Sequence, residues 1–353
     1  MLAVISLTKG GAKQAKRVKK LIPEADCYAK FDLNDTSLLP FEKRFSALVE
    51  MCFKNYSEIL FIMATGIVVR TIAPLLKHKS KDPAILVMDE KGQFIIPLLS
   101  GHLGGANQKA IELAKSLQAT PVITTASDVC GLKAVDEFAK EQSLFLSDFD
   151  GAKQVTADLV NGKAVGVFSH ESLDLVLPLE YEKFEGKTGW MELEKKLQLG
   201  TIESFIIIGD EKFDSAYSHV QLYPRKFCIG IGCRRGIRME KLKEEALKML
   251  DQAGIAKEGV GVFGTAWVKA NELGILALAN YWNAEMKSFQ KEEILGVADR
   301  FIGSDFVQAT IGVPCVSEPC GYLSAKGGIC TVPVQKNNGI TLSLWQKKEG
   351  EVR

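Results

Sequence analysis

The chain has 353 residues, and its 44 lysine and arginine residues almost balance its 43 aspartate and glutamate residues, which gives a formal net charge of +1. A balance this close to neutral argues against a protein that holds nucleic acid or an anionic membrane by bulk positive charge. The length favours two or three compact domains, each large enough to bury its own core. The longest apolar stretch, residues 59–69, is far shorter than the ~20 residues of a membrane-spanning helix. We therefore expect neither a nucleic-acid nor a membrane partner.

The N-terminus and the cysteines indicate a cytoplasmic protein. The opening residues carry no basic segment ahead of a short apolar run, and no small-residue cleavage site follows, so we expect no secretion signal. The eight cysteines are scattered along the chain, which favours reduced thiols over a disulfide framework. No CxxC pair occurs and no histidine lies near the cysteine pairs in sequence, so we expect no protein-bound metal.

The first part of the chain repeats the order of strand, glycine turn and helix that is typical of α/β folds. Continuous apolar runs predict parallel strands that helices cover on both faces. Pro97 confines its strand to a sheet edge or to the strand's own end, because proline has no N–H to donate. The expected elements are a strand at 2–7, a helix to 22, a helix over 41–56, a strand at 59–64, a helix from 65, a strand pair over 84–99, a helix with Ile111, Leu113, Ala114 and Leu117 on one face, and a strand at 121–125.

The rest of the chain predicts two further α/β regions. Residues 210–225 are polar and read as a linker, and a new strand with glycines begins at Cys228. Asn338-Gly339 between two alternating segments predicts a β-hairpin, because a type I′ turn needs positive φ at both central residues. The other expected elements are helices near 152–160, 238–250, 271–281, 291–298 and 318–325, strands at 164–168, 205–208 and 329–335, and a solvated helix or loop over 181–200.

We therefore expect a multi-domain α/β protein. Its N-terminal parallel-sheet α/β domain covers 1–135, a small middle α/β domain covers 136–222, and a C-terminal α/β domain covers 226–353 and ends in the hairpin.

Three segments place small or hydroxyl residues where a predicted strand ends: MATGIVVR (63–70), SGHLGGAN (100–107) and TTASD (124–128). Ligands of parallel sheets bind at this edge, where helix N-termini present free N–H groups that suit an anion. Any one of these glycines could serve a tight turn only, but several together favour a site. The candidate binding residues are Thr65, Gly66, Arg70, Gly101, Gly104, Gly105, Asn107, Thr124 and Thr125.

His102 and Asp128 are the candidate catalytic residues. Imidazole titrates near neutrality, so His102 can relay a proton or donate to a developing oxyanion. The alternative for His102 is a turn histidine bonded to backbone, and for Asp128 it is a helix cap. Asp89 and Glu90 read first as turn residues and only second as acid or base candidates.

The segment after the C-terminal glycine run holds a further candidate. Its Gly-x-Gly lacks the third glycine and the acidic residue of a dinucleotide fingerprint. Arg234 and Arg235 instead suit carboxylates, which guanidinium groups bind bidentately, although a solvated charge pair is equally compatible. The basic neighbours of Cys233 could lower the pKa of its thiol and make it a nucleophile.

Four stretches of the chain are similar to a known family: MATGIVVRTIAPLL from residue 63, DPAILVMDEKGQFIIPLLSGHLGGANQKA from residue 82, PVITTASD from residue 121 and CIGIGCRRGI from residue 228. In these stretches the chain resembles the cobalt-precorrin 5A hydrolases of anaerobic cobalamin (vitamin B12) biosynthesis. The similarity covers about 45–135 and the chain from 226 onward, and the middle diverges. VKANELG at 268–274 and SEPCGYLSA at 317–325 depart from the family's usual pattern.

The resemblance implies a reaction in which water opens the δ-lactone of cobalt-precorrin 5A and a two-carbon fragment leaves as acetaldehyde, giving cobalt-precorrin 5B. Cobalt then arrives within the tetrapyrrole substrate, and no protein-bound cofactor is implied. His102 is the expected acid/base residue and Asp128 an orienting or second proton-transfer group, with Asn107, Thr124 and Thr125 as donors. Arg70, Arg234 and Arg235 would meet the substrate's carboxylates. A homo-oligomer and hand-over to other corrin-pathway enzymes are compatible with this reading.

Two other functions stay open on the sequence. The glycine loops fit a phosphate- or nucleotide-binding α/β enzyme, although no Walker pattern occurs. The same basic residues would also serve a non-catalytic tetrapyrrole-binding carrier that hands on an unstable intermediate.

Overall fold

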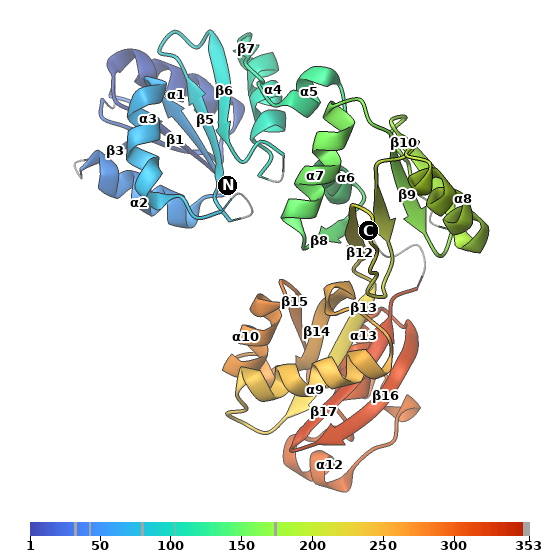
Figure 1. Ribbon diagram of the computed structural model, residues 1–353. Helices are drawn as coiled ribbons and strands as arrows, with labels where there is room; N and C mark the ends of the chain where they lie inside the picture. Colours follow the sequence, from blue (N-terminus) through green and yellow to red (C-terminus); the bar gives the residue numbers. More distant parts are fainter. Residues whose placement is uncertain (32–33, 42–43, 79–80, 103, 173–174, 349–353) are drawn as a thin grey trace. The chain divides into compact units, whose positions relative to one another are not determined.

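The computed structural model describes residues 1–31, 34–41, 44–78, 81–102, 104–172 and 175–348. The chain forms two compact units, Met1–Glu137 and Phe138–Arg353. The first unit holds a seven-stranded sheet and the second holds two five-stranded sheets, all combined with helices (Figure 1). The mixed α/β fold class is thereby confirmed, while the three domain boundaries stay predictions. Within the described ranges, no helix is both long and apolar enough to cross a membrane.

The first unit is a sheet in the order β3-β2-β1-β4-β5-β6-β7, in which only β5 and β6 pair antiparallel. Leu2 and Val4 of β1 pack with α1 and α4, whereas Ala3 and Ile5 pack with α2 and α3 on the other face. Burial on both faces explains the continuous apolar runs. The elements are β1 (Leu2–Ser6), α1 (Lys9–Leu21), β2 (Asp26–Ala29), β3 (Leu39–Pro40), α2 (Phe45–Asn55), β4 (Glu58–Ile62), α3 (Thr65–Ile72), β5 (Ala84–Met88), β6 (Phe94–Leu99), α4 (Ala106–Leu117), β7 (Thr120–Pro121) and α5 (Ala126–Cys130). Helix α6 (Val135–Glu141) begins in the first unit and ends in the second.

Three details of this unit differ from the sequence prediction. The strand with Pro97, β6, is not at the edge of the sheet, because β7 lies outside it. However, β7 pairs only with Phe94 and Ile95, so Pro97 has no hydrogen-bonding partner strand on that side, where its missing N–H would be needed. The strand expected at 121–125 is only Thr120–Pro121. Ile111 is exposed on α4, whereas Leu113 is buried. Of the helix expected over 41–56, residues 42–43 lie outside the described part.

The second unit begins with a sheet in the order β10-β9-β11-β12-β8, where β8 alone runs antiparallel to its neighbour. The prediction of a polar linker over 210–225 is wrong for its second half: β12 is a strand whose Val220 and Leu222 are buried. The solvated segment over 181–200 is largely a strand and a helix. The elements here are β8 (Leu144–Leu146), α7 (Phe149–Val160), β9 (Val165–Ser169), β10 (Tyr181–Glu185), α8 (Gly186–Gln198), β11 (Ser204–Ile208) and β12 (His219–Pro224).

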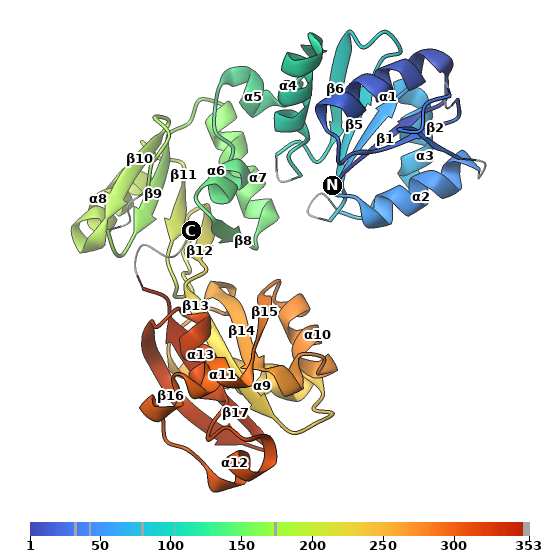
Figure 2. The ribbon, with the colours of Figure 1, turned by 180° about the vertical axis from the view of Figure 1, so that it is seen from behind.

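The last sheet has the order β15-β14-β13-β17-β16. Helices α9 and α10 cover one face and α13 covers the other, as the two opposite views show (Figures 1 and 2). Asn338 and Gly339 have φ values of 51° and 78°, which confirms the predicted hairpin turn. The elements are β13 (Phe227–Cys233), α9 (Met239–Gln252), β14 (Val260–Ala266), α10 (Leu273–Tyr281), β15 (Glu285–Phe289), α11 (Lys291–Leu295), α12 (Asp305–Ile311), α13 (Ser317–Ser324), β16 (Ile329–Asn337) and β17 (Ile340–Gln346).

Gly230 of β13 serves packing. A Cβ atom added there would lie 1.8 Å from the carbonyl oxygen of Ser317 and 2.7 Å from the backbone nitrogen of Gly321. The glycine therefore lets α13 lie directly on the strand, which explains a glycine that the sequence left between a structural and a ligand-binding role.

Candidate active site and a cationic cavity

A cluster of polar side chains lies beyond the ends of β6 and β7. These strands are parallel neighbours, so the chain leaves both at the same edge of the sheet. After β6 the loop brings His102 to α4, and after β7 the chain passes Thr125 and enters α5, which carries Asp128. Leu103 of this loop lies outside the described residues. Ser100, at the start of the loop, has a φ of 58°, a left-handed conformation that costs energy outside glycine and recurs at functional sites.

The structure brings four predicted residues of this unit into one hydrogen-bonded network. His102 Nε2 lies 2.9 Å from Asp128 Oδ2. The side-chain amide of Asn107 donates to the same Asp128 oxygen at 2.9 Å and to Thr125 Oγ1 at 3.0 Å. Whether these residues have the expected roles stays a prediction, but neither alternative of an isolated turn histidine or a simple helix cap accounts for this convergence.

Two further residues of the cluster were missed by the sequence analysis. Asp136, in the first turn of α6, places Oδ1 3.2 Å from His102 Nδ1. Ser127, which is buried, places Oγ 3.4 Å from His102 Nε2. An acidic residue in a first helical turn is common for helix-dipole reasons alone, so the sequence carried no signal that would single out Asp136.

The carboxylates change the acid strength of His102. Its pKa is raised from the usual 6.5 to about 9, mainly by the hydrogen bond to Asp136 and further by Asp128, against the opposing effect of burial. The expectation of an imidazole that titrates near neutrality is therefore wrong. A pKa of about 9 favours the imidazolium at neutral pH, a form that donates hydrogen bonds and protons and has no free lone pair.

The glycines of the loop between β6 and α4 are explained by the space and the backbone conformation that each position requires. A Cβ atom at Gly101 would lie 2.8 Å from Asn107 Oδ1, and one at Gly104 would lie 2.4 Å from the Cβ of Ser100. Gly105 precedes α4 with a φ of 82°. Gly101 thus leaves room for the Asn107 side chain, and the other two permit the turn.

The remaining predicted residues of this unit make no described contact with the His102 network. Thr65 and Gly66 begin α3 beyond β4, which β5 separates from β6. The Arg70 guanidinium folds back over this first turn, 3.5 Å from where a Cβ of Gly66 would be. Thr124 is exposed. Asp89 accepts the N–H groups of three following residues, as expected of a turn residue.

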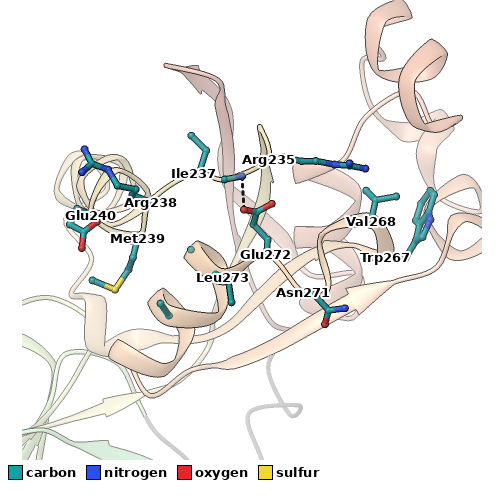
Figure 3. A pocket seen from close by; sticks show the side chains of 13 residues that line it. Arg235, Ile237, Arg238, Met239, Glu240, Trp267, Val268, Asn271, Glu272 and Leu273 are labelled. Atoms are coloured by element: carbon teal, nitrogen blue, oxygen red, sulfur yellow. Dashed lines mark hydrogen bonds between the residues drawn. The ribbon is translucent and has the colours of Figure 1, made fainter.

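A second candidate region is a cavity of about 570 Å³ in the second unit. It lies where the chain leaves β13 and β14, which are parallel neighbours (Figure 3). Arg238, Met239 and Glu240 stand on one side, and Arg235, Val268 and Trp267 on the other. The lining residues are Arg235, Gly236, Ile237, Arg238, Met239, Glu240, Trp267, Val268, Asn271, Glu272, Leu273, Gly274 and Ala277.

Two exposed arginines, Arg235 and Arg238, bring positive charge to this cavity, and its acidic lining residues are Glu240 and Glu272. Glu272 accepts from Lys269 Nζ at 2.7 Å and from the Gly236 N–H at 2.8 Å, and these bonds lower the pKa of its carboxyl group. Its negative charge is thereby compensated. Leu273 is 80 % exposed beside these groups, so the cavity offers cations next to apolar surface.

Arg234 and Cys233 differ from the sequence prediction. Arg234 does not line the cavity, because its side chain lies against Gly339 in the hairpin turn. Burial raises the pKa of the Cys233 thiol to about 11, so the expected lowering by basic neighbours is wrong. In the part of the chain that the structure describes, no three His, Cys, Asp or Glu side chains are grouped so as to hold a metal ion.

Comparison with known proteins defines the class as proteins of cobalamin biosynthesis. Residues 47–128 match the family model "Cobalamin synthesis G N-terminal", residues 133–224 match "Cobalamin biosynthesis central region" and residues 227–345 match "Cobalamin synthesis G C-terminus". The similarity thus includes the middle that seemed divergent in sequence.

Two relatives are similar over nearly their full lengths. The chain is 32% identical to the cobalt-precorrin-5A hydrolase of Salmonella typhimurium, over 97% of both chains. It is 28% identical to the cobalt-precorrin-5A hydrolase of Priestia megaterium, over 97% of this chain and 94% of the relative. The chain therefore belongs to the cobalt-precorrin-5A hydrolase family.

Proposed function

We propose that this protein is a cobalt-precorrin-5A hydrolase. It adds water across the δ-lactone of cobalt-precorrin 5A and releases the two-carbon fragment as acetaldehyde, which leaves cobalt-precorrin 5B. Beside family membership, the observation that carries this proposal is the network of His102, Asp128 and Asp136, because it combines a carboxylate and a charged imidazole in one partly buried place.

The chemistry needs both kinds of group. Attack of water on the lactone carbonyl releases a proton, builds negative charge on the carbonyl oxygen and expels an alkoxide that must be protonated. The freed hydroxyl then loses its proton as the neighbouring carbon–carbon bond breaks, and the bonding electrons pass into the conjugated macrocycle. Acetaldehyde is the product of that cleavage. Cobalt is part of the substrate in this scheme, and no protein-bound cofactor takes part.

We propose that the cavity of the second unit binds the carboxylate side chains of the macrocycle. Arg235 and Arg238 suit carboxylates through charge-assisted hydrogen bonds. The apolar surface of Trp267 and Leu273 suits the less polar body of a tetrapyrrole. Arg238 thus replaces Arg234 among the proposed substrate-binding residues.

The test is single-turnover release of acetaldehyde from cobalt-precorrin 5A, with acetaldehyde trapped and quantified. Wild-type protein releases one equivalent, and His102→Ala is expected to lose at least 100-fold in rate, within the range by which acid–base groups contribute. Binding is followed in parallel by the corrinoid absorption spectrum. Binding without acetaldehyde release in the wild type would make the protein a carrier, and unchanged release by His102→Ala would remove the His102 network from the reaction.

A further inference from the structure

We infer that Asp128 is the general base and that His102, held by Asp136, is the general acid of the hydrolysis. This inference rests on the proposed function and reverses the simplest roles for an aspartate and a histidine in one site. Asp136 is a positioning residue in it, because it acts through the His102 ring and touches no reacting atom.

The first step of the argument is geometric. Both ring nitrogens of His102 face carboxylate oxygens, Nδ1 at 3.2 Å and Nε2 at 2.9 Å. A nitrogen lone pair does not face an ionised carboxylate at such a distance, so each nitrogen carries a hydrogen unless one carboxyl group takes the proton instead. In either case the three groups hold the same number of protons, and both ring nitrogens are engaged with carboxyl groups, so neither offers a lone pair to water.

The surroundings of the ring support the charged form. The His102 side chain is 14 % exposed and that of Asp136 is 12 % exposed, so solvent screens their attraction only in part. Among the described residues, the charged groups that face the ring are Asp128 of α5 and Asp136 of α6, both acidic, while Ser127 beside Nε2 is uncharged. The pKa of His102, about 9, agrees with this arrangement.

Asp128 is placed to act as the base. Its two hydrogen bonds within the described residues, from His102 and from Asn107, both end on Oδ2. Oδ1 is therefore available to a water molecule, and the side chain is 24 % exposed. Asn107 and Thr125 fix the orientation of the carboxylate, so that Oδ2 stays with the ring while Oδ1 points elsewhere.

The steps balance without another reactant. Asp128 Oδ1 takes a proton from water as the water oxygen bonds to the lactone carbonyl carbon. The ring C–O bond then breaks, and the leaving alkoxide takes the Nε2 proton of His102. The proton on Asp128 Oδ1 then leaves to solvent water and Nε2 takes a proton from solvent water, which restores the carboxylate and the imidazolium. One water is consumed, and Asp128 is again ionised and able to accept the hydroxyl proton when the carbon–carbon bond breaks.

The test combines a spectroscopic titration with a pH–rate profile on the full chain. Nitrogen-15 NMR of ring-labelled histidine reports whether each nitrogen carries a proton, and His102→Gln assigns the signal among the four histidines. We expect both nitrogens to be protonated at pH 7.5 with a midpoint near 9. In Asp136→Asn the midpoint falls by at least one pH unit, and the alkaline limb of kcat moves down by the same amount.

Control variants distinguish the effect of the Asp136 charge on His102 from a general effect on folding. Glu137→Gln removes a negative charge one residue away, where the side chain pairs with Lys133, and is expected to change neither the midpoint nor kcat. Asp136→Glu keeps the charge and restores most of the midpoint, which also covers the case in which Asp136→Asn does not fold. Asp128→Asn loses at least 100-fold in kcat.

Two results would overturn the assignment: a neutral His102 ring in the wild type at pH 7.5, or a kcat that rises as the ring loses its proton. Because the NMR titration needs no substrate, the charged ring is tested even if no acetaldehyde is released. An absence of release refutes the proposed function, and a neutral ring refutes the inference alone.

Discussion

Replacing His102 by glutamine should abolish a large pH dependence of stability in the first unit. The folded-state pKa of His102 is about 9 against an ordinary 6.5. A raised pKa means that folding is favoured by proton uptake, so this contribution is complete below pH 6.5 and is lost as the pH rises through 9. The difference of roughly 2.5 pH units corresponds to about 3 kcal/mol at about 1.4 kcal/mol per unit. The wild type should therefore lose about 3 kcal/mol between pH 6 and pH 10 that His102→Gln does not lose.

The assay must distinguish the two units. All four tryptophans, Trp190, Trp267, Trp282 and Trp345, belong to the second unit, so tryptophan fluorescence during urea unfolding reports that unit only and serves as an internal control. The first unit is followed by pulse proteolysis in urea, with its peptides identified by mass spectrometry. Comparing the two proteins at each pH cancels the titration of all other groups. An equal loss of the free energy of unfolding in both proteins would show that the carboxylates do not hold the proton on His102.

Three further outcomes are expected. Gly230→Ala should destabilise the second unit by about 1–3 kcal/mol or more, as read by tryptophan fluorescence in urea, because its Cβ would lie 1.8 Å from a backbone oxygen of α13; Gly209→Ala, with open space around it, is the control, and equal midpoints would contradict the packing argument. Arg235→Ala should weaken corrinoid binding about tenfold in an optical titration, and Arg234→Ala much less; the reverse order would place the binding surface elsewhere. Raising the ionic strength from about 0.05 to about 0.5 M should weaken binding several-fold and change kcat less than twofold, and a salt-dependent kcat with constant affinity would refute this division.

The sequence predicted the strands and helices that depend on one local pattern. Continuous apolar runs marked β4 and β5, and Asn338-Gly339 marked the hairpin, because each of these signals reflects burial or φ at the residues themselves. The strand β12 was missed because its residues alternate in a short segment after a polar stretch, and the burial of Val220 and Leu222 depends on the neighbouring elements β11, β8 and α7.

Some residues of the candidate site could likewise be predicted from the sequence, and others could not. His102, Asp128 and Asn107 follow strand ends, and parallel neighbours bring such ends together, so their proximity could be anticipated. Asp136 could not, because it approaches His102 only when α6 packs beside the loop after β6. The acid strength of the ring depends on that packing. The charge state of the site was therefore the part of the chemistry that the sequence could not predict.

The two candidate regions have opposite electrostatic designs, and each design fits its task. Proton transfer by Asp128 and His102 needs fixed partners that solvent screens little, and these side chains are largely buried. Capture of a polyanionic macrocycle needs cations that meet the ligand in water, and Arg235 and Arg238 are exposed. A net negative cluster would repel the same carboxylates if it had to bind them. Binding energy therefore has to come from cationic residues outside the cluster, which is why substitutions in the cavity should act on affinity and substitutions in the cluster on turnover.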